Sequence, residues 1–296
     1  MSLGIERGHY IAMCVQDPEA AAQFAAEKMG LQLAHVTNDG SYYLQAKGWD
    51  PYSLVYKPGE PGIDHISYLV KDRSTLLVAE EKLRKAGVEI VQTVSESGEW
   101  KHDDALRFLV PGGFVIELTT GIHVEKPMAA LVEAPGDNFG PISLDHAVTR
   151  IIDTEEAYRF WTGIMGLKLS ARIATPDDQT AMMFFRCKTL FHCYALAKSD
   201  RNALHHYQLT LKDPVSLYAT YERMRELGVD IVWGPLRHGP GHNIAFYIRD
   251  YAGNVVEYSC EEEIILHDET YRPRNWSVTD PKTLDEWGTM PPEGFL

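Results

Sequence analysis

Bulky apolar residues occupy every second position in the run from Ile244 to Arg249, so their side chains fall on one face. A period of two is typical of a β-strand. A second short run follows a Gly-Asn pair, at residues 255–258, and the two runs together predict a β-hairpin. The second run carries Glu257 between a valine and a tyrosine. Because an ionised carboxylate is costly to bury without a partner, we expect Glu257 to face a cation.

Elsewhere the apolar positions follow a helical period. Residues 75–86 and 216–227 each carry an apolar stripe at helical spacing, with charged residues on the opposite face. Gly87 and Gly228 follow these runs at the positions where helices commonly end. We therefore expect two amphipathic helices whose charges form a solvated outer face.

Three pairs of segments repeat along the chain. The members of each pair share the order of their strands, helix starts and glycines, and one pair shares the ending Met-Gly-Leu-x-Leu. Such internal similarity indicates duplication. The pairs are 9–33 with 145–169, 64–90 with 205–231, and 105–118 with 243–258.

These repeats predict an α+β fold of two domains, each a pair of βαβββ modules that form a curved mixed sheet around a metal-binding cavity. A segment rich in proline and glycine separates the halves and reads as a linker. The polar last stretch fits no repeat unit, so it is either a disordered tail or an arm folded over a site. The predicted boundaries are 1–125 for the first domain, 126–143 for the linker, 144–262 for the second domain and 263–296 for the arm.

Charge and composition narrow the classes of partner. The 28 basic and 42 acidic residues give a net charge of −14, which argues against nucleic acid or an anionic membrane as the main partner. No apolar run approaches the length of a bilayer span and the first residues lack the apolar core of a signal peptide, so we expect a cytoplasmic protein. Four cysteines without CxxC spacing indicate neither disulfides nor a thiolate zinc site.

The repeat supplies candidate partners for Glu257. His146 stands at the start of the first strand of the third unit, and His206 stands at the equivalent place in the fourth. Two imidazoles and one carboxylate on neighbouring strands can bind one face of a divalent metal, usually ferrous iron, and leave positions open. Adjacent His205 is the alternative ligand, because strand alternation places it on the opposite face from His206.

The sequence resembles the type I extradiol catechol dioxygenases of the vicinal oxygen chelate superfamily over nearly the whole chain. The resemblance rests on His146 in LDHAV, on the FHC and LHHYQL segments, and on the RHG…Y…E run that ends at Glu257. It implies that His146, His206 and Glu257 bind the metal. It also implies that His192, His238 and Tyr247 act in catalysis beside it.

The resemblance further implies Fe(II), with Mn(II) as a second possibility, and a catechol and O2 as substrates. Tyr247 would hydrogen-bond a diol oxygen, His192, with a pKa near neutrality, would deliver a proton as the ring opens, and His238 would bind the substrate or an intermediate. A homo-oligomer is also implied. His242 has no equivalent role and is expected to be a loop residue. Arg274 and Trp276 resemble the family's C-terminal arm, which approaches the site.

The N-terminal half contains His9, His65 and Glu117 at positions that the repeat equates with the three ligands. Arg107 occupies the position in this half that corresponds to Tyr247 in the other half. We therefore expect a relic site in this half, with a second bound metal as the alternative.

Two rival functions belong to the same fold. One is other metal chemistry, as in a glyoxalase-like isomerase or a 4-hydroxyphenylpyruvate-type dioxygenase. His192, His238 and Tyr247 argue against it. The other is a metal-free small-molecule binding or resistance protein.

Overall fold

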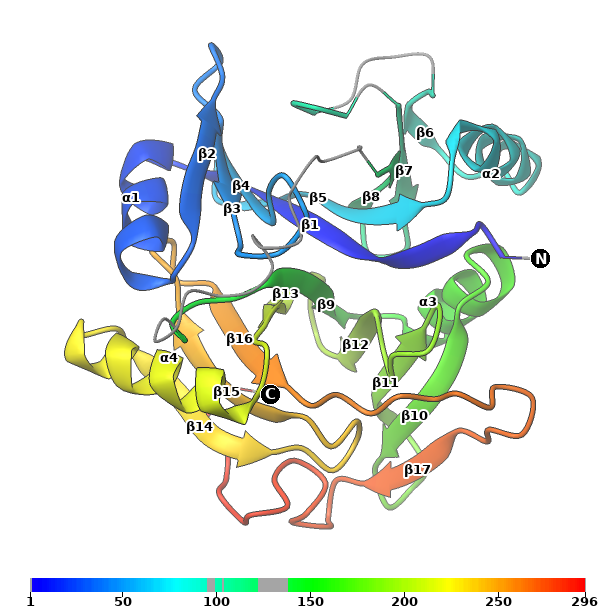
Figure 1. Ribbon diagram of the computed structural model, residues 1–296. Helices are drawn as coiled ribbons and strands as arrows, with labels where there is room; N and C mark the ends of the chain where they lie inside the picture. Colours follow the sequence, from blue (N-terminus) through cyan, green and yellow to red (C-terminus); the bar gives the residue numbers. More distant parts are fainter. Residues whose placement is uncertain (1, 95–98, 103, 122–137, 296) are drawn as a thin grey trace.

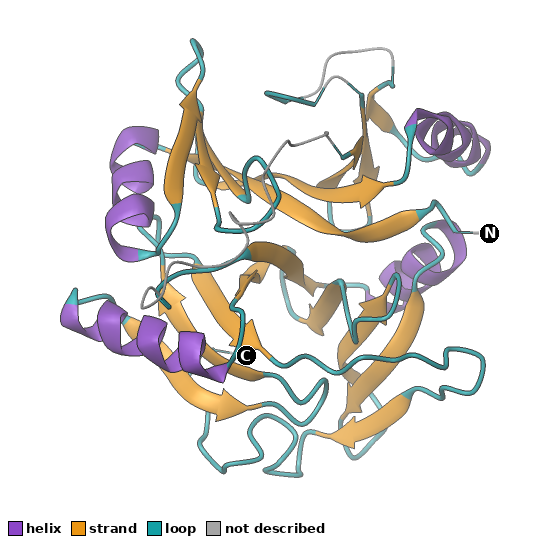
Figure 2. Ribbon diagram, in the orientation of Figure 1, coloured by secondary structure: helices purple, strands orange, loops and turns teal. Residues whose placement is uncertain are grey.

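The chain folds into two mixed β-sheets, with few helices (Figures 1 and 2). The computed structural model describes residues 2–94, 99–102, 104–121 and 138–295. The first sheet has eight strands in the order β2-β3-β4-β1-β5-β8-β7-β6. Its strands are β1 (Ile5–Val15), β2 (Gln32–Val36), β3 (Tyr42–Gln45), β4 (Leu54–Pro58), β5 (Gly62–Val70), β6 (Ile90–Gln92), β7 (Ala105–Val110) and β8 (Phe114–Thr120).

The second sheet has nine strands in the order β14-β15-β16-β13-β9-β12-β11-β10-β17. Apart from the edge strand β17, it repeats the first sheet, with β9 and β13 in the central places of β1 and β5. Its strands are β9 (Ser143–Ile151), β10 (Lys168–Ala174), β11 (Thr180–Arg186), β12 (Tyr194–Lys198), β13 (Ala203–Thr210), β14 (Ile231–Arg237), β15 (Ile244–Arg249), β16 (Val255–Cys260) and β17 (Arg274–Ser277).

Each half of the chain therefore consists of two βαβββ modules, whose strands form one sheet. The predicted fold class is confirmed. In every module the first strand is followed by one helical segment and three further strands. The last of these strands pairs in parallel with the first strand of the same module. The helices are α1 (Pro18–Lys28), α2 (Arg73–Lys85), α3 (Thr154–Arg159), continued by the π-helical turn η2 (Phe160–Ile164), and α4 (Pro214–Glu226).

An aspartate begins each of these helices. The side chains of Asp17, Asp72, Asp153 and Asp213 each accept a hydrogen bond from a backbone N–H in the first turn. These bonds satisfy donors that the helix itself leaves unpaired. The two amphipathic helices predicted at residues 75–86 and 216–227 correspond to α2 and α4.

The two halves meet where β1 lies along β9, the strand that carries His146 (Figure 1). The contact is close because Gly8 of β1 has no side chain. A Cβ atom at Gly8 would lie 1.8 Å from the carbonyl oxygen of Asp145. The Tyr258 hydroxyl also joins the halves, since it donates a hydrogen bond of 2.9 Å to the Met29 carbonyl oxygen.

The last stretch of the chain folds back as an arm. Its strand β17 pairs in parallel with β10 at the edge of the second sheet. Residues 126–137 of the predicted linker lie outside the described residues, and the predicted domain boundaries stay a prediction. Among the described residues, no helix is both long and apolar enough to cross a membrane.

We expect Gly8→Ala to destabilise the protein, because the new methyl group would meet backbone that can move only with β9. Overpacking of this kind costs about 1–3 kcal/mol in the free energy of unfolding. Urea denaturation measures it. The matched control is Gly62→Ala, at a strand glycine where an added Cβ would meet no atom within 4 Å and which has no positive φ. An equal loss in both variants would contradict the role given to Gly8.

Candidate metal centre

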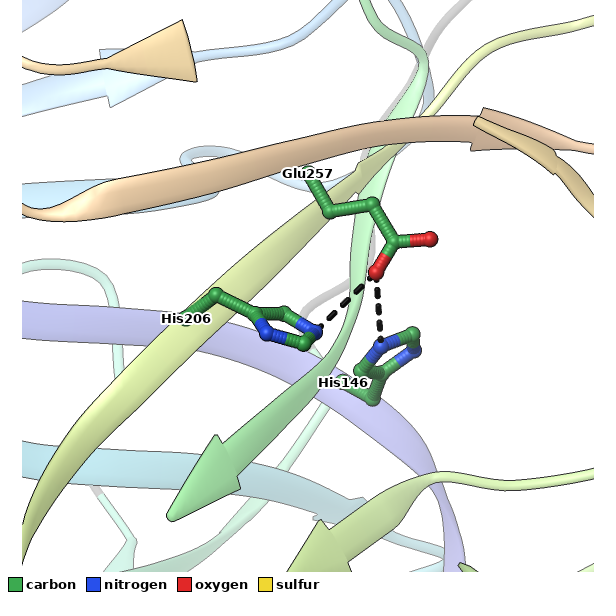
Figure 3. A group of neighbouring side chains, drawn as sticks. All are labelled: His146, His206 and Glu257. Carbon is green, nitrogen blue, oxygen red and sulfur yellow. Dashed lines mark ion pairs between the residues drawn. The ribbon is translucent and has the colours of Figure 1, made fainter. Parts of the chain in front are cut away.

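Three neighbouring strands of the second sheet bring together His146, His206 and Glu257 (Figure 3). They come from β9, β13 and β16, and all three side chains are buried. The distance from Glu257 Oε2 is 3.0 Å to His206 Nε2 and 3.7 Å to His146 Nε2. Strand alternation points the three side chains to one face of the sheet, as the sequence predicted.

Each imidazole is oriented by a contact on its other nitrogen. Nδ1 of His146 lies 3.1 Å from Asp145 Oδ2, and Nδ1 of His206 lies 2.7 Å from Nδ1 of His205. Both rings therefore present Nε2 toward Glu257. His205 instead packs its ring against Phe295. Of the two adjacent histidines, His206 is thus the one that faces Glu257.

The charge of Glu257 has no arginine or lysine partner among the described residues. Within 4.0 Å its described ion-pair partners are His146, His206 and His238, and Asn243 donates a hydrogen bond of 2.9 Å to Oε1. Burial alone would raise the pKa of Glu257, but the contacts with His146 and His206 hold it well below its usual value. The group is therefore an anion held by imidazoles.

The pKa values of His146 and His206 shift in opposite directions. Burial favours the neutral ring of His146, yet hydrogen bonds to Asp145 and Glu257 raise its pKa to about 9. Burial lowers the pKa of His206, and Glu257 offsets only part of that effect.

The three side chains fit a divalent metal. They offer two imidazole nitrogens and one carboxylate oxygen, all within 4.8 Å of one another. Bonds of about 2.0–2.2 Å to one ion would place adjacent donor atoms roughly 3 Å apart. The separations of 3.0 and 3.7 Å are close to that value. The Nδ1 contact of His146 with the Asp145 carboxylate is typical of metal-binding histidines.

His192 lies beside this cluster, in the loop between β11 and β12. Its Nε2 is 3.1 Å from His146 Nε2, and its backbone N–H donates to Glu262 Oε1 over 3.0 Å. Burial, and then the positive charge of His146, lower the pKa of His192 well below its usual value. The near-neutral pKa expected from the sequence is therefore wrong here, because the ring is buried beside another imidazole.

His238 and Tyr247 form a hydrogen-bonded pair on the other side of the cluster. His238 Nε2 lies 2.7 Å from the Tyr247 hydroxyl, and His238 Nδ1 lies 2.7 Å from the Leu284 carbonyl oxygen. Because a carbonyl only accepts, Nδ1 carries a proton, and in the neutral ring Nε2 accepts from Tyr247. Burial, and then the charge of Glu257, raise the pKa of Tyr247 well above its usual value. Tyr247 stands opposite Glu257 in the β15–β16 pairing.

A cavity of about 50 Å³ opens in front of these groups, and we call it the inner cavity. No arginine or lysine is among the described residues that line it. Its lining residues are Val148, Ile173, Met182, Phe184, His192, His205, His206, Trp233, His238, Pro240, Asn243, Tyr247, Glu257, Thr283, Leu284 and Phe295.

Several of these residues were not predicted. Asn243 shares the strand face of Ala245 and Tyr247, so alternation could have identified it. Thr283, Leu284 and Phe295 belong to the arm, whose path has no periodic signal in the sequence. Arg274 and Trp276 lie on β17 and do not line the cavity. His242 lies in a loop, as expected, and its Nδ1 is 2.9 Å from Glu286 Oε1.

The N-terminal half requires a correction. Tyr10, and not His9, occupies the place of His146. Both residues precede the aspartate that caps the next helix by seven positions. The Tyr10 hydroxyl donates to Glu117 Oε1 over 2.7 Å and lies 2.7 Å from His65 Nε2, whereas His9 lies 3.6 Å from Asp50. The triad of His9, His65 and Glu117 is therefore not assembled.

Arg107 supplies the cation that the buried carboxylate of this half needs. Its Nη2 lies 2.8 Å from Glu117 Oε2 and 2.7 Å from Glu99 Oε1. Arg107 stands opposite Glu117 in the strand pairing, as Tyr247 stands opposite Glu257. Burial alone would raise the pKa of Glu117, but the charges of His65 and Arg107 lower it. A guanidinium thus stands in this half where the other half has a candidate metal site.

A second group of possible ligands lies nearby and consists of Asp64, His65 and Glu99. Lys57 Nζ lies 3.2 Å from Asp64 and 3.1 Å from Glu99. Because both carboxylates already have a cation from the chain, we assign no metal to this group.

We expect Arg107→Met to lower the free energy of unfolding by about 3–5 kcal/mol, since it leaves Glu117 as a buried charge without its main cation. Thermal or urea denaturation measures the loss. Arg84→Met removes a surface pair with Glu80 and serves as the control, with an expected change of roughly 0.5 kcal/mol or less. A change as small in Arg107→Met would refute this account of Glu117.

Known proteins of similar sequence cover almost the whole chain. The biphenyl-2,3-diol 1,2-dioxygenase of Metapseudomonas furukawaii is 25% identical over 291 residues, which are 94% of this chain and 91% of the relative. The 3-methylcatechol 2,3-dioxygenase of Pseudomonas putida is 25% identical over 300 residues, with coverages of 97% and 98%.

Solved structures show the same fold. The homoprotocatechuate 2,3-dioxygenase of Arthrobacter globiformis superposes with a TM-score of 0.86 at 22% identity, over 98% of this chain and 89% of that one. The Mn(II)-bound glyoxalase of Novosphingobium aromaticivorans superposes with a TM-score of 0.85 at 22% identity, over 98% and 93%.

The family model agrees with both the duplication and the predicted superfamily, since it matches residues 7–118 and again residues 143–258. This chain belongs to the Glyoxalase/Bleomycin resistance protein/Dioxygenase superfamily.

Proposed function

We propose that this protein is an extradiol dioxygenase that cleaves the ring of a catechol with O2 at a mononuclear Fe(II), with Mn(II) as the second candidate metal. His146, His206 and Glu257 are the proposed ligands. One observation carries the proposal: Glu257 is buried without an arginine or lysine partner among the described residues, whereas its counterpart Glu117 has Arg107. The relatives named as dioxygenases support the same reaction class.

A divalent ion on one face of two imidazoles and one carboxylate supplies open coordination positions and acidifies a bound hydroxyl group. The proposed reaction inserts both atoms of O2 into the product. The carbon–carbon bond beside the two hydroxyl-bearing carbons breaks, and no reductant is consumed. The ring-opened acid therefore retains every atom of the catechol and of O2.

We assign the transfer of the diol proton to the pair of Tyr247 and His238. Tyr247 donates to His238 Nε2, so a proton that reaches the tyrosine oxygen can pass on to the imidazole. The Leu284 carbonyl holds Nδ1–H and so fixes the ring with Nε2 toward Tyr247. His238 is therefore the proposed base, and Tyr247 the proposed contact to a diol oxygen.

We assign proton delivery during ring opening to His192. Burial keeps the ring neutral, so it can first accept a proton released from the substrate and then deliver that proton as the ring opens. Its backbone N–H donates to Glu262, whose Oε1 also lies 2.5 Å from Nδ1, though not in hydrogen-bond geometry. Burial, and then Asp145, raise the pKa of Glu262 well above its usual value, which favours a neutral carboxyl group beside the neutral ring.

Apolar walls support an aromatic substrate. Val148, Phe184 and Trp233 line the inner cavity together with the candidate catalytic groups. A flat ring packed against such walls would leave its two hydroxyl groups to face the histidines. The homo-oligomer implied by the resemblance belongs to the same proposal.

Oxygen uptake tests the function. We expect protein loaded with Fe(II) under nitrogen to consume one O2 per catechol and to give a ring-opened, coloured product. Glu257→Gln should lose both the metal and the activity, because the amide is a poor ligand. Glu117→Gln is the matched control and should retain one metal per chain. Absence of oxygen uptake with every catechol tried, in protein that holds iron, would reject the proposal.

His192→Ala separates proton delivery from metal binding. We expect this variant to keep its metal and to lose about 10²–10⁴-fold in kcat, the usual contribution of a general acid. Metal analysis and steady-state kinetics on the same sample measure the two effects. Loss of metal would instead make His192 a ligand.

A further inference from the structure

A second and larger cavity lies behind one wall of the inner cavity. Its volume is about 520 Å³, and we call it the outer cavity. His205 and Phe295 line both cavities and so form the wall between them. The outer cavity also contains Arg150 and Arg201, whereas no described residue lining the inner cavity is basic apart from histidine.

The inner cavity is too small for a substituted ring. Its volume of about 50 Å³ is about a tenth of the volume of the outer cavity, about 520 Å³. A catechol with a side chain therefore needs space from a displaced wall. Most other walls are strand residues held by ladder hydrogen bonds, such as Phe184 in β11 and Tyr247 in β15.

Phe295 is a wall residue that no sheet ladder holds. It lies outside the sheets, near the end of the arm. Its ring lies 4.9 Å from that of Tyr247 and 5.2 Å from that of Trp233, between centroids. Its backbone N–H donates to the Pro292 carbonyl, and its carbonyl accepts from Arg150 Nη2 over 2.9 Å. The side chain itself is held only by packing.

The charges of the outer cavity define what could enter once the wall is removed. Three arginines, Arg150, Arg201 and Arg249, line the cavity together with two carboxylates, Asp230 and Glu293. Arg249 is paired with Asp230 at 3.7 Å, so the arginines remain in excess over the carboxylates. Arg150 and Arg201 have no carboxylate partner within ion-pair distance among the described residues. Two guanidinium groups that face one cavity without such partners favour a carboxylate ligand.

We propose that Phe295 determines substrate specificity by closing the inner cavity against the outer cavity. With Phe295 in place the site takes compact, uncharged catechols. Without its ring, the outer cavity becomes a subsite for a carboxylate-bearing substituent, bound by Arg150 and Arg201. This inference rests on the proposed function for its substrate but on the two cavities for its geometry.

The test compares catechol with 3,4-dihydroxyphenylacetate, a catechol with a carboxylate side chain. We expect Phe295→Ala to raise the ratio of kcat/KM for the acid to that for catechol by about tenfold or more. Adding Arg201→Gln should remove most of this gain, because one of the two cations is lost. Met290→Ala, an arm residue whose relative exposure is 65%, is the control and should leave the ratio unchanged.

Calorimetric titration of the acid into iron-loaded protein under nitrogen gives a second readout that needs no turnover. Tighter binding to Phe295→Ala than to the wild type supports the inference even if catechol is not cleaved, so failure of the proposed function is recognised separately. If Phe295→Ala does not fold, Phe295→Leu decides, with a smaller gain expected. An unchanged ratio and unchanged binding in a folded variant overturn the role of Phe295. A gain that survives Arg201→Gln in full overturns the role of the arginines.

Discussion

Burial of one carboxylate in each half is the constraint on which the rest of this structure depends. An ionised carboxylate in the interior must have a cation and hydrogen-bond donors. Glu117 and Glu257 occupy equivalent strand positions, yet their partners differ. Arg107 neutralises Glu117 from the facing strand, whereas Glu257 faces imidazoles, an amide and a tyrosine. Two exchanges, Arg107 for Tyr247 and Tyr10 for His146, thus separate a self-neutralised half from one suited to a metal.

The duplicated sheet holds this arrangement rigidly. His146, His206 and Glu257 come from three adjacent strands, so their spacing follows from ladder hydrogen bonds and the alternation of side chains. The N-terminal half supports the same strands from behind. Because Gly8 lies against the Asp145 backbone, β9 is held at the residue next to His146. The N-terminal half therefore contributes to the geometry of the candidate centre through packing and through hydrogen bonds such as that from the Tyr68 hydroxyl to the carbonyl oxygen of Cys193, the neighbour of His192.

The arm completes the site from a distant part of the chain. Its Leu284 carbonyl selects the tautomer of His238, and Phe295 lines the inner cavity. A hydrogen bond from the Arg237 backbone N–H to the Asp285 side chain holds this part of the arm against β14. Orientation of the proposed base and the size of the cavity thus both depend on residues that belong to no repeat.

The sequence by itself determined the fold and the core of the candidate site. The duplication, the period of two and the aspartates at helix starts can all be read from the chain. They are enough to place His146 and His206 on the first strands of their units and Glu257 on the last strand of its unit. Tertiary structure decided what local pattern does not encode. Tyr10 replaces His9 because register, and not residue type, sets which side chain points inward. The contacts of Phe295 depend on the path of the arm across long separations in the chain, and the pairing of Arg107 with Glu99 depends on side-chain geometry. No periodicity in the sequence reports either.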